Sequence, residues 1–173
     1  MDKHTHEIVG LVTEIARAAL SSEKQYFIGG GLAIDLSVGK ITRNHHDIDF
    51  HPMLKDTPWW IDWFEKRRLL VKKIEGGHFP ETYNIFDQGG EMVVDLWPME
   101  LKEGVLLINQ DGSYVDAGRH WEETRVVKYN GVDFNVENPQ RVLEQKLRHV
   151  KQGQPFRDQD RHDFKLLGQD PGI

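Results

Sequence analysis

Apolar residues recur every three or four positions in several parts of the chain, and this spacing predicts five helices. The clearest of them covers about residues 5–22. Thr57-Pro58 is suited to be the N-cap and first residue of a helix that runs to about Leu70. The remaining helices are expected over residues 32–38, over residues 138–150 and around Phe164.

Strand signals fill most of the chain between these helices. Residues 25–28 are a short apolar run, and residues 47–51 alternate strictly between polar and apolar side chains, which predicts a strand with two different faces. From Val71 to Val136 the pattern is mostly that of strands, with one hairpin around residues 87–90. A second hairpin is predicted at Asn130-Gly131, a dipeptide that favours tight two-residue turns.

The order of these elements predicts the α+β class, with helices packed on a mixed β-sheet. A length of 173 residues is close to that of one domain, so we expect residues 1–173 to form a single domain. Its C-terminal part, from about residue 138, is expected to be helical.

Composition narrows the possible functions. Five Trp and eight Phe exclude a disordered chain, and no apolar run approaches the roughly 20 residues of a membrane span. The absence of cysteine excludes disulfides, thiolate catalysis and cysteine-bound zinc. A formal net charge of −6 disfavours nucleic acid as a partner, because an acidic surface repels phosphate backbones. No apolar signal segment follows Met1, so we expect a cytoplasmic protein.

Three signals for chemistry lie in the first 100 residues. Gly29-Gly30-Gly31 stands at a strand-to-helix junction, where the backbone can approach a phosphate, although a plain turn is the commoner use of such a triplet. Asp47 and Asp49 share one strand face, which suits either a hard cation or a solvated surface neutralised by Arg43 or a histidine. Asp95 interrupts an apolar strand. We expect the strands that carry these acids to be neighbours, because only then can all three reach one cation.

Two blocks of sequence resemble the opening motif of the DNA polymerase β-like nucleotidyltransferase superfamily. Residues 28–35 read IGGGLAID, and residues 39–49 read GKITRNHHDID. More narrowly, the pattern resembles the small antibiotic adenylyltransferases of the aminoglycoside 2''-type and the lincosamide type. Asp95, within VDLWP, matches the third acid of these proteins, and residues 157–164 resemble their closing motif. Leu32 at a position that is usually aromatic is the main departure.

The resemblance implies the nucleotidyltransferase fold and a Mg²⁺-dependent enzyme that uses a nucleoside triphosphate, with ATP favoured. The acids Asp47 and Asp49 would hold the metal on the phosphates, and Asp95 would share the metal or deprotonate the acceptor. Four further residues would bind the nucleotide, namely Gly30 and Gly31, which would cradle its phosphates, Arg43 and Lys146.

The implied reaction moves a nucleoside monophosphate to a hydroxyl of a small antibiotic-like acceptor and releases pyrophosphate. The acidic balance favours an aminoglycoside over a lincosamide. One alternative is a toxin-type nucleotidyltransferase that modifies tRNA or protein. Another is a nucleotide-binding module that has lost turnover, although the intact triad of acids argues against it.

Two groups of residues have both a structural and a functional interpretation. Trp59, Trp60 and Trp63 on one predicted helix are more often core residues than a stacking platform, but they could line an acceptor cleft. Asp35, which the motif matches, is expected to pair with Arg43 and to order the loop between them.

Overall fold

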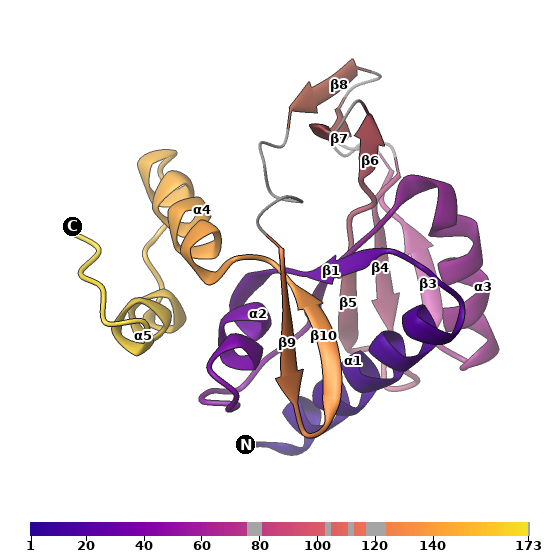
Figure 1. Cartoon of the computed structure of the whole chain (residues 1–173), viewed down its shortest axis with the longest axis horizontal. Coiled ribbons are helices and arrows are strands. Elements are labelled where there is room, and N and C mark those ends of the chain that lie inside the picture. The colour runs from indigo at the N-terminus through magenta and orange to yellow at the C-terminus, as the bar shows by residue number, and fades with distance from the viewer. Residues whose placement is uncertain (76–80, 103–104, 111–112, 117–123, 173) are drawn as a thin grey trace.

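The computed structural model describes residues 1–75, 81–102, 105–110, 113–116 and 124–172 (Figure 1). Its elements follow in the order α1 (Lys3–Ser21), β1 (Tyr26–Ile28), α2 (Gly30–Ser37), β2 (Ile48–Pro52), a 3₁₀ turn (Leu54–Asp56), α3 (Thr57–Lys66), β3 (Leu70–Lys73), β4 (Tyr83–Phe86), β5 (Met92–Leu96), β6 (Glu100–Lys102), β7 (Val105–Gln110), β8 (Ser113–Asp116), β9 (Arg125–Tyr129), β10 (Val132–Val136), α4 (Pro139–Lys151) and α5 (Asp158–Leu166).

The larger sheet has seven strands in the order β3-β4-β5-β2-β1-β10-β9. Its pairs β2–β5 and β1–β10 are parallel, and the other pairs are antiparallel. A separate antiparallel sheet has the order β6-β7-β8. The mixed sheet and the α+β class predicted from the sequence are therefore confirmed.

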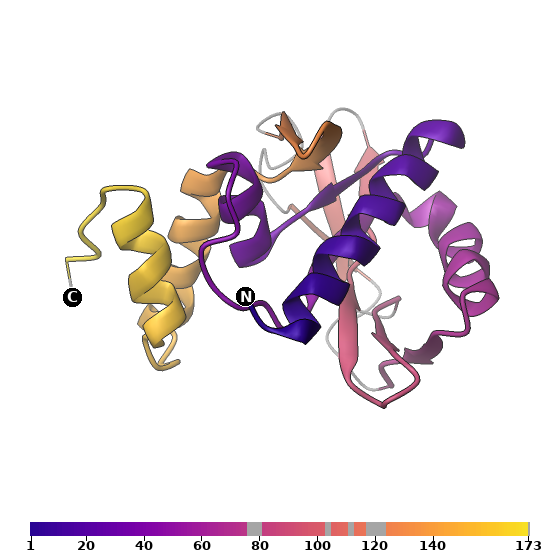
Figure 2. The same ribbon diagram turned by 90° about the horizontal axis from the view of Figure 1, so that it is seen from below.

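Helices α1 and α3 supply the apolar face against which the larger sheet packs (Figure 2). In α1 the side chains that share one stripe, including Ile8, Val12 and Ile15, are fully buried, and Asp2 caps the helix by accepting a hydrogen bond from the Thr5 N–H. Helices α4 and α5 lie together at the opposite end of the molecule from α3 (Figures 1 and 2).

The tryptophans of α3 belong mainly to the core. Trp60 is fully buried, and its ring meets Phe50 of β2 edge-on, with 4.8 Å between the ring centroids. Trp63 is 8% exposed, and Trp59 packs partly buried against the same cluster. The core interpretation is thus confirmed for Trp60 and Trp63.

Helix α3 differs from its prediction at both ends. Thr57 is not the N-cap but the first helical residue, since the 3₁₀ turn leads directly into the helix. Its side-chain oxygen is buried and has no hydrogen-bond partner among the described residues. The helix ends at Lys66 instead of Leu70, because Arg68 has a left-handed backbone with φ of 61° and the chain then enters β3.

The two predicted hairpins are present. Strands β4 and β5 pair antiparallel across residues 87–91, and β9 and β10 pair across Asn130-Gly131. Both residues of this second turn have positive φ, 46° and 77°, as the tight turn requires. Across the described ranges, no helix combines the length and the apolar character needed to cross a membrane.

Candidate active site

Two carboxylates lie opposite each other where β2 and β5 run side by side, and a third stands just before β2. Because these strands are parallel neighbours, Asp49 lies directly opposite Asp95, and Asp47 stands immediately before β2. Ile48 and Phe50 are fully buried in the core, so strand alternation directs Asp49 to the other face of the sheet. The prediction that the strands bearing these acids are neighbours is confirmed.

The site is electrostatically unfavourable for its own acids. Burial, followed by the negative charges of Asp47, Asp95 and Glu137, raises the pKa of Asp49 to about 7. Burial also raises the pKa of Asp95 to about 6, with a further contribution from Asp47 against an opposing hydrogen bond from Trp97. The oxygen Oδ1 of Asp95 is buried without a hydrogen-bond partner among the described residues. The cluster therefore has an excess of negative charge and an unused oxygen ligand.

These properties fit a hard divalent cation, because carboxylate oxygens are the ligands that Mg²⁺ prefers and a cation would relieve their repulsion. Within the described part of the chain, however, no three histidine, aspartate or glutamate side chains are already arranged so that they could hold a metal ion. The donor atoms are suitable, and the side chains would have to turn toward one another to bind one ion.

The glycines before α2 make room for functional side chains. Gly30 has φ of +60°, and a Cβ placed on it would lie 1.7 Å from Oδ2 of Asp49. A Cβ on Gly31 would lie 1.5 Å from Nη2 of Arg43. These positions therefore accept only glycine if Asp49 and Arg43 are to keep their places. The cradling of phosphates by the same glycines stays a prediction.

A buried ion-pair network joins the loop after α2 to the C-terminal helices. Arg43 donates Nε to Oδ1 of Asp163 at 2.9 Å and Nη2 to Oδ2 at 3.2 Å. Lys146 on α4 lies 2.6 Å from Asp160 and 3.2 Å from Asp163, which is fully buried. Burial works to raise the pKa of Asp160, but hydrogen bonds from Arg157 and Lys146 outweigh it and lower the pKa to about 2.

The structure thus brings Arg43 and Lys146 together through Asp163. The positive charge of Lys146 also acts on Asp49, whose pKa it lowers against the larger opposing effects. Of the two cations predicted to bind the nucleotide, Lys146 thus lies near Asp49, and both cations are already held by carboxylates of α5.

Asp35 has a different partner from the one expected. Its buried carboxylate accepts hydrogen bonds from the Thr42 N–H at 2.8 Å and the Thr42 hydroxyl at 2.6 Å, and it pairs with Nε2 of His45 at 2.8 Å. Arg43 pairs with Asp163 instead. The expected pair with Arg43 is therefore wrong, because the Arg43 side chain turns toward α5, whereas the ordering of this loop by Asp35 is observed.

Glu137 is a fourth carboxylate of the site that the sequence analysis missed. It follows β10 directly, is 2% exposed, and accepts a hydrogen bond from Nε2 of Gln145 at 3.1 Å. It acts on Asp49 by raising its pKa. The sequence did contain a signal for Glu137, because it is an acid that directly follows an apolar strand. Asp95 was found by a similar signal, an acid within an apolar strand.

Solved structures with a similar fold include nucleotidyltransferases. The chain matches the lincomycin-bound lincosamide antibiotic adenylyltransferase LnuA with a TM-score of 0.74 at 17% identity, covering 96% of this chain and 98% of that one. It matches ANT(2'')-Ia in complex with adenylyl-2''-tobramycin with a TM-score of 0.69 at 19% identity, covering 94% and 87%. An antigenic nucleotidyltransferase-like protein of Paracoccidioides brasiliensis matches with a TM-score of 0.58 at 19% identity, covering 94% and 76%. The fold is that of the nucleotidyltransferases.

Sequence comparison defines the family more narrowly. The model of the aminoglycoside-2''-adenylyltransferase family matches residues 11–167. The chain therefore belongs to this family and is a nucleotidyltransferase. A search of curated protein sequences finds no match.

Proposed function

We propose that this enzyme transfers the AMP group of ATP to a hydroxyl of a small antibiotic acceptor, an aminoglycoside or a lincosamide, and releases pyrophosphate. The observation that carries the proposal is the juxtaposition of Asp49 and Asp95 on parallel strands, with Asp47 beside them. Three acids that repel one another are costly to the fold, and a function that requires their charge accounts for that cost.

Asp47 and Asp49 would hold Mg²⁺, which when bound neutralises phosphate charge and orients the triphosphate, and Asp95 would either share this ion or accept the proton of the acceptor. Lys146 and Arg43 lie on the side of the site formed by α4 and α5. Their positive charges would attract the phosphates of the nucleotide there. Asp163 fixes the direction of both cations, so it is a positioning residue in this scheme.

Asp95 is suited to accept the proton of the acceptor. With a pKa of about 6 it is mostly ionised at neutral pH and is a stronger base than an ordinary aspartate. As the acceptor oxygen forms its bond to the α-phosphorus, the bond from that phosphorus to the bridging oxygen of pyrophosphate breaks. The hydroxyl proton passes to Asp95, and the electron pair of the broken bond leaves with pyrophosphate.

The acceptor is inferred from charge and family. A net charge of −6 and a cluster of carboxylates attract a polycation, which favours an aminoglycoside. The family is described by the 2''-adenylylation of aminoglycosides, and two structures of the same fold were solved with lincomycin and with adenylyl-2''-tobramycin. A toxin-type enzyme acting on tRNA or protein, and a module without turnover, are the alternatives.

One incubation separates these alternatives. The protein is mixed with radiolabelled ATP and MgCl₂, and with an aminoglycoside panel, lincomycin, tRNA or no acceptor. Label and a nucleotidyl mass increment on an antibiotic support the proposal, with Asp47→Asn as the inactive control. Label on tRNA or on a protein alone supports the toxin-type reading, and no label on any acceptor supports the inactive module.

Replacing Asp95 by asparagine should lower the rate of transfer by roughly 10²–10⁴-fold, because a general base acts in the transition state. Binding of ATP should change much less. The wild-type rate should rise with pH as Asp95 and Asp49, whose pKa values burial raises, lose their protons, and the variant should lack the part of this rise that is due to Asp95. Steady-state kinetics from pH 5 to 8 and ATP titration test this. Asp133→Asn on the exposed side of β10 is the matched control, and an unchanged pH profile in D95N would remove Asp95 from this role.

Gly30→Ala should inactivate the enzyme by moving Asp49. The left-handed backbone alone costs an alanine about 1–2 kcal/mol, and the new Cβ would also displace the Asp49 carboxylate. Gly39 is a matched control, since it too has positive φ, 73°, but nothing lies within 4 Å of its added Cβ. Both variants should lose stability in thermal melts, but only G30A should lose transfer, by about a hundredfold. Equal activity in the two variants would show that the space beside Gly30 is not required.

A further inference from the structure

The ion-pair network of the C-terminal helices includes a third cation, Arg157, which stands just before α5. Arg157 donates Nε to Oδ2 of Asp160 at 2.9 Å and Nη2 to Oδ1 at 3.0 Å. Lys146 donates Nζ to the same Oδ1 at 2.6 Å. The buried carboxylate of Asp160 therefore holds two positive charges side by side, on one of its oxygens.

The pair with Asp160 leaves part of the Arg157 guanidinium available. Its third nitrogen, Nη1, makes no hydrogen bond to any residue that the structure describes. The side chain is 56% exposed, whereas those of Lys146 and Arg43 are 9% and 14% exposed. A guanidinium that a carboxylate fixes on one edge can donate from its other edge, and arginine is well suited to phosphate oxygens. Of these three cations, Arg157 is the one that a ligand can reach most easily.

Arg157 also lies within electrostatic reach of the candidate active site. Its hydrogen bonds with Asp160 raise the pKa of Arg157, and the charges of Asp49 and Asp163 raise it further against the opposing effect of burial. Lys146 acts on the same acid, since it lowers the pKa of Asp49. Both cations that Asp160 holds are therefore near Asp49.

The charges within these ion pairs do not balance. The cations of the network are Arg43, Lys146 and Arg157. They are held by two carboxylates, Asp160 and Asp163. One positive charge is left over at the side of the site where the accessible guanidinium lies, and an anion is the ligand that would offset it.

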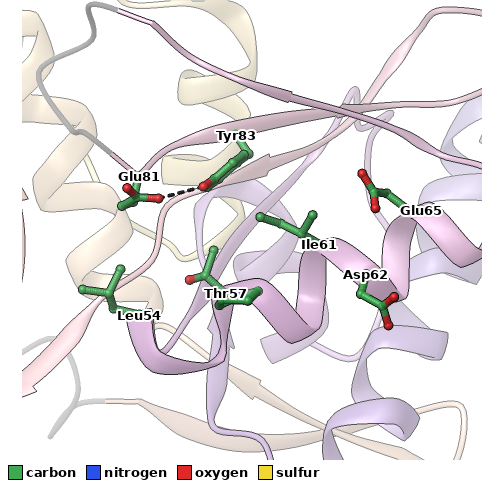
Figure 3. A pocket seen from close by; sticks show the side chains of 8 residues that line it. Leu54, Thr57, Ile61, Asp62, Glu65, Glu81 and Tyr83 are labelled. Carbon is green, nitrogen blue, oxygen red and sulfur yellow. Dashed lines mark hydrogen bonds between the residues drawn. The ribbon is translucent and has the colours of Figure 1, made fainter.

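The cavity between α3 and β4 is not an alternative place for such an anion (Figure 3). Its volume of about 580 Å³ would admit a small ligand, but its described lining contains Asp62, Glu65 and Glu81 and no basic side chain. Figure 3 shows carboxylates at both ends of this cavity. They would repel a phosphate, so the network of α4 and α5 is the better place for one.

We propose that Arg157 binds the β- and γ-phosphates of ATP, the part that leaves as pyrophosphate. Its Nη1 donates to a phosphate oxygen while Nε and Nη2 stay on Asp160, and Lys146 lies beside it on the same carboxylate. This inference rests on the proposed function, because it takes ATP as the nucleotide. It adds a residue through which the enzyme distinguishes a triphosphate from a monophosphate.

The test is calorimetric titration of the full chain with ATP in the presence of MgCl₂, and separately with AMP and with inorganic pyrophosphate. Arg157→Gln should raise the dissociation constant of ATP by about tenfold, the size expected for one lost hydrogen bond between charged groups. Pyrophosphate should also bind more weakly to this variant, whereas AMP, which lacks both phosphates, should bind as it does to the wild type. Arg157→Lys keeps the charge but not the second edge of the guanidinium, so its affinity for ATP should lie between the two.

Arg161→Gln is the matched control. It removes an equal charge from the next turn of α5, where the guanidinium lies over the Phe156 ring, and it should leave ATP binding unchanged. The assignment of Arg157 is overturned if R157Q binds ATP as tightly as the wild type, if R161Q weakens ATP binding equally, or if R157Q loses as much affinity for AMP as for ATP. A wild type that binds neither ATP nor pyrophosphate is a different result, because it overturns the proposed function as well.

Discussion

Asp49→Asn should abolish nucleotidyl transfer and at the same time stabilise the folded protein above neutral pH. The pKa of Asp49 is about 7 in the folded state and near 3.8 in the unfolded chain. An acid whose pKa is raised by folding favours the folded state only while it is protonated. Its stabilising effect is thus lost as pH rises from about 4 to 7, and above that range the full cost of the buried charge remains. Asparagine has no such charge.

The gain in stability should therefore depend on pH. We expect D49N to exceed the wild type by roughly 1–3 kcal/mol at pH 8, or by several degrees in Tm, and by much less at pH 5. Thermal melts without divalent metal at both pH values measure this, and an assay with ATP and Mg²⁺ measures transfer. Asp133→Asn, on the exposed side of β10, should change neither. A D49N protein that transferred AMP at near the wild-type rate would exclude Asp49 from the site.

Asp163→Asn should have the opposite effect on stability. Asp163 is fully buried and bonds Arg43 through two nitrogens and Lys146 through a third. Asparagine preserves the size but removes the charge, which leaves the partly buried Arg43 without its counter-ion. Breaking one side of a buried ion pair typically costs about 3–5 kcal/mol. Lys146 retains Asp160, so the loss should fall mainly on the contact between the Arg43 loop and α5.

Urea unfolding tests this prediction. The midpoint should fall strongly while the slope of the transition stays constant, which is the signature of lost stability without a change in the area exposed. Transfer should also decline, because Arg43 loses its fixed direction. Asp158→Asn removes a charge from the exposed start of the same helix and should shift the midpoint little. If D163N unfolded at the wild-type midpoint, the network would contribute specificity of packing and not stability.

Much of the fold and part of the site could be predicted from the sequence. Periodicity predicted the helices and the hairpins, because both depend on residues that are close along the chain. The meeting of Asp49 and Asp95 was also predicted, since a shared cation would require it. The partner of Asp35 was not, because choosing between Arg43 and His45 depends on where the Arg43 side chain goes. That is decided by Asp163, which is 120 residues further along the chain.

The surroundings of the glycines before α2 and of Glu137 could not be predicted for the same reason. The phosphate cradle of Gly30 and Gly31 stays a prediction, but the sequence did not indicate that an added Cβ at these positions would meet the side chains of Asp49 and Arg43, which come from a different segment. Glu137 was missed because its closeness to Asp49 depends on the order of strands in the sheet, with β10 beside β1 and β1 beside β2. Contacts between side chains from distant segments depend on tertiary packing, which the pattern of neighbouring residues in the sequence does not reveal.

The ion pair between Arg43 and Asp163 also makes the arrangement of the Arg43 loop depend on a distant part of the chain. The pair closes a loop of 120 residues, so it forms only after Asp163 has left the ribosome. The strands that carry Asp49 and Asp95 pair with each other without any residue of α5, whereas Arg43 has its counter-ion only when α5 is in place. The docking of α5 therefore completes the Arg43 side of the site, and anything that keeps α5 away from the sheet leaves Arg43 without this counter-ion.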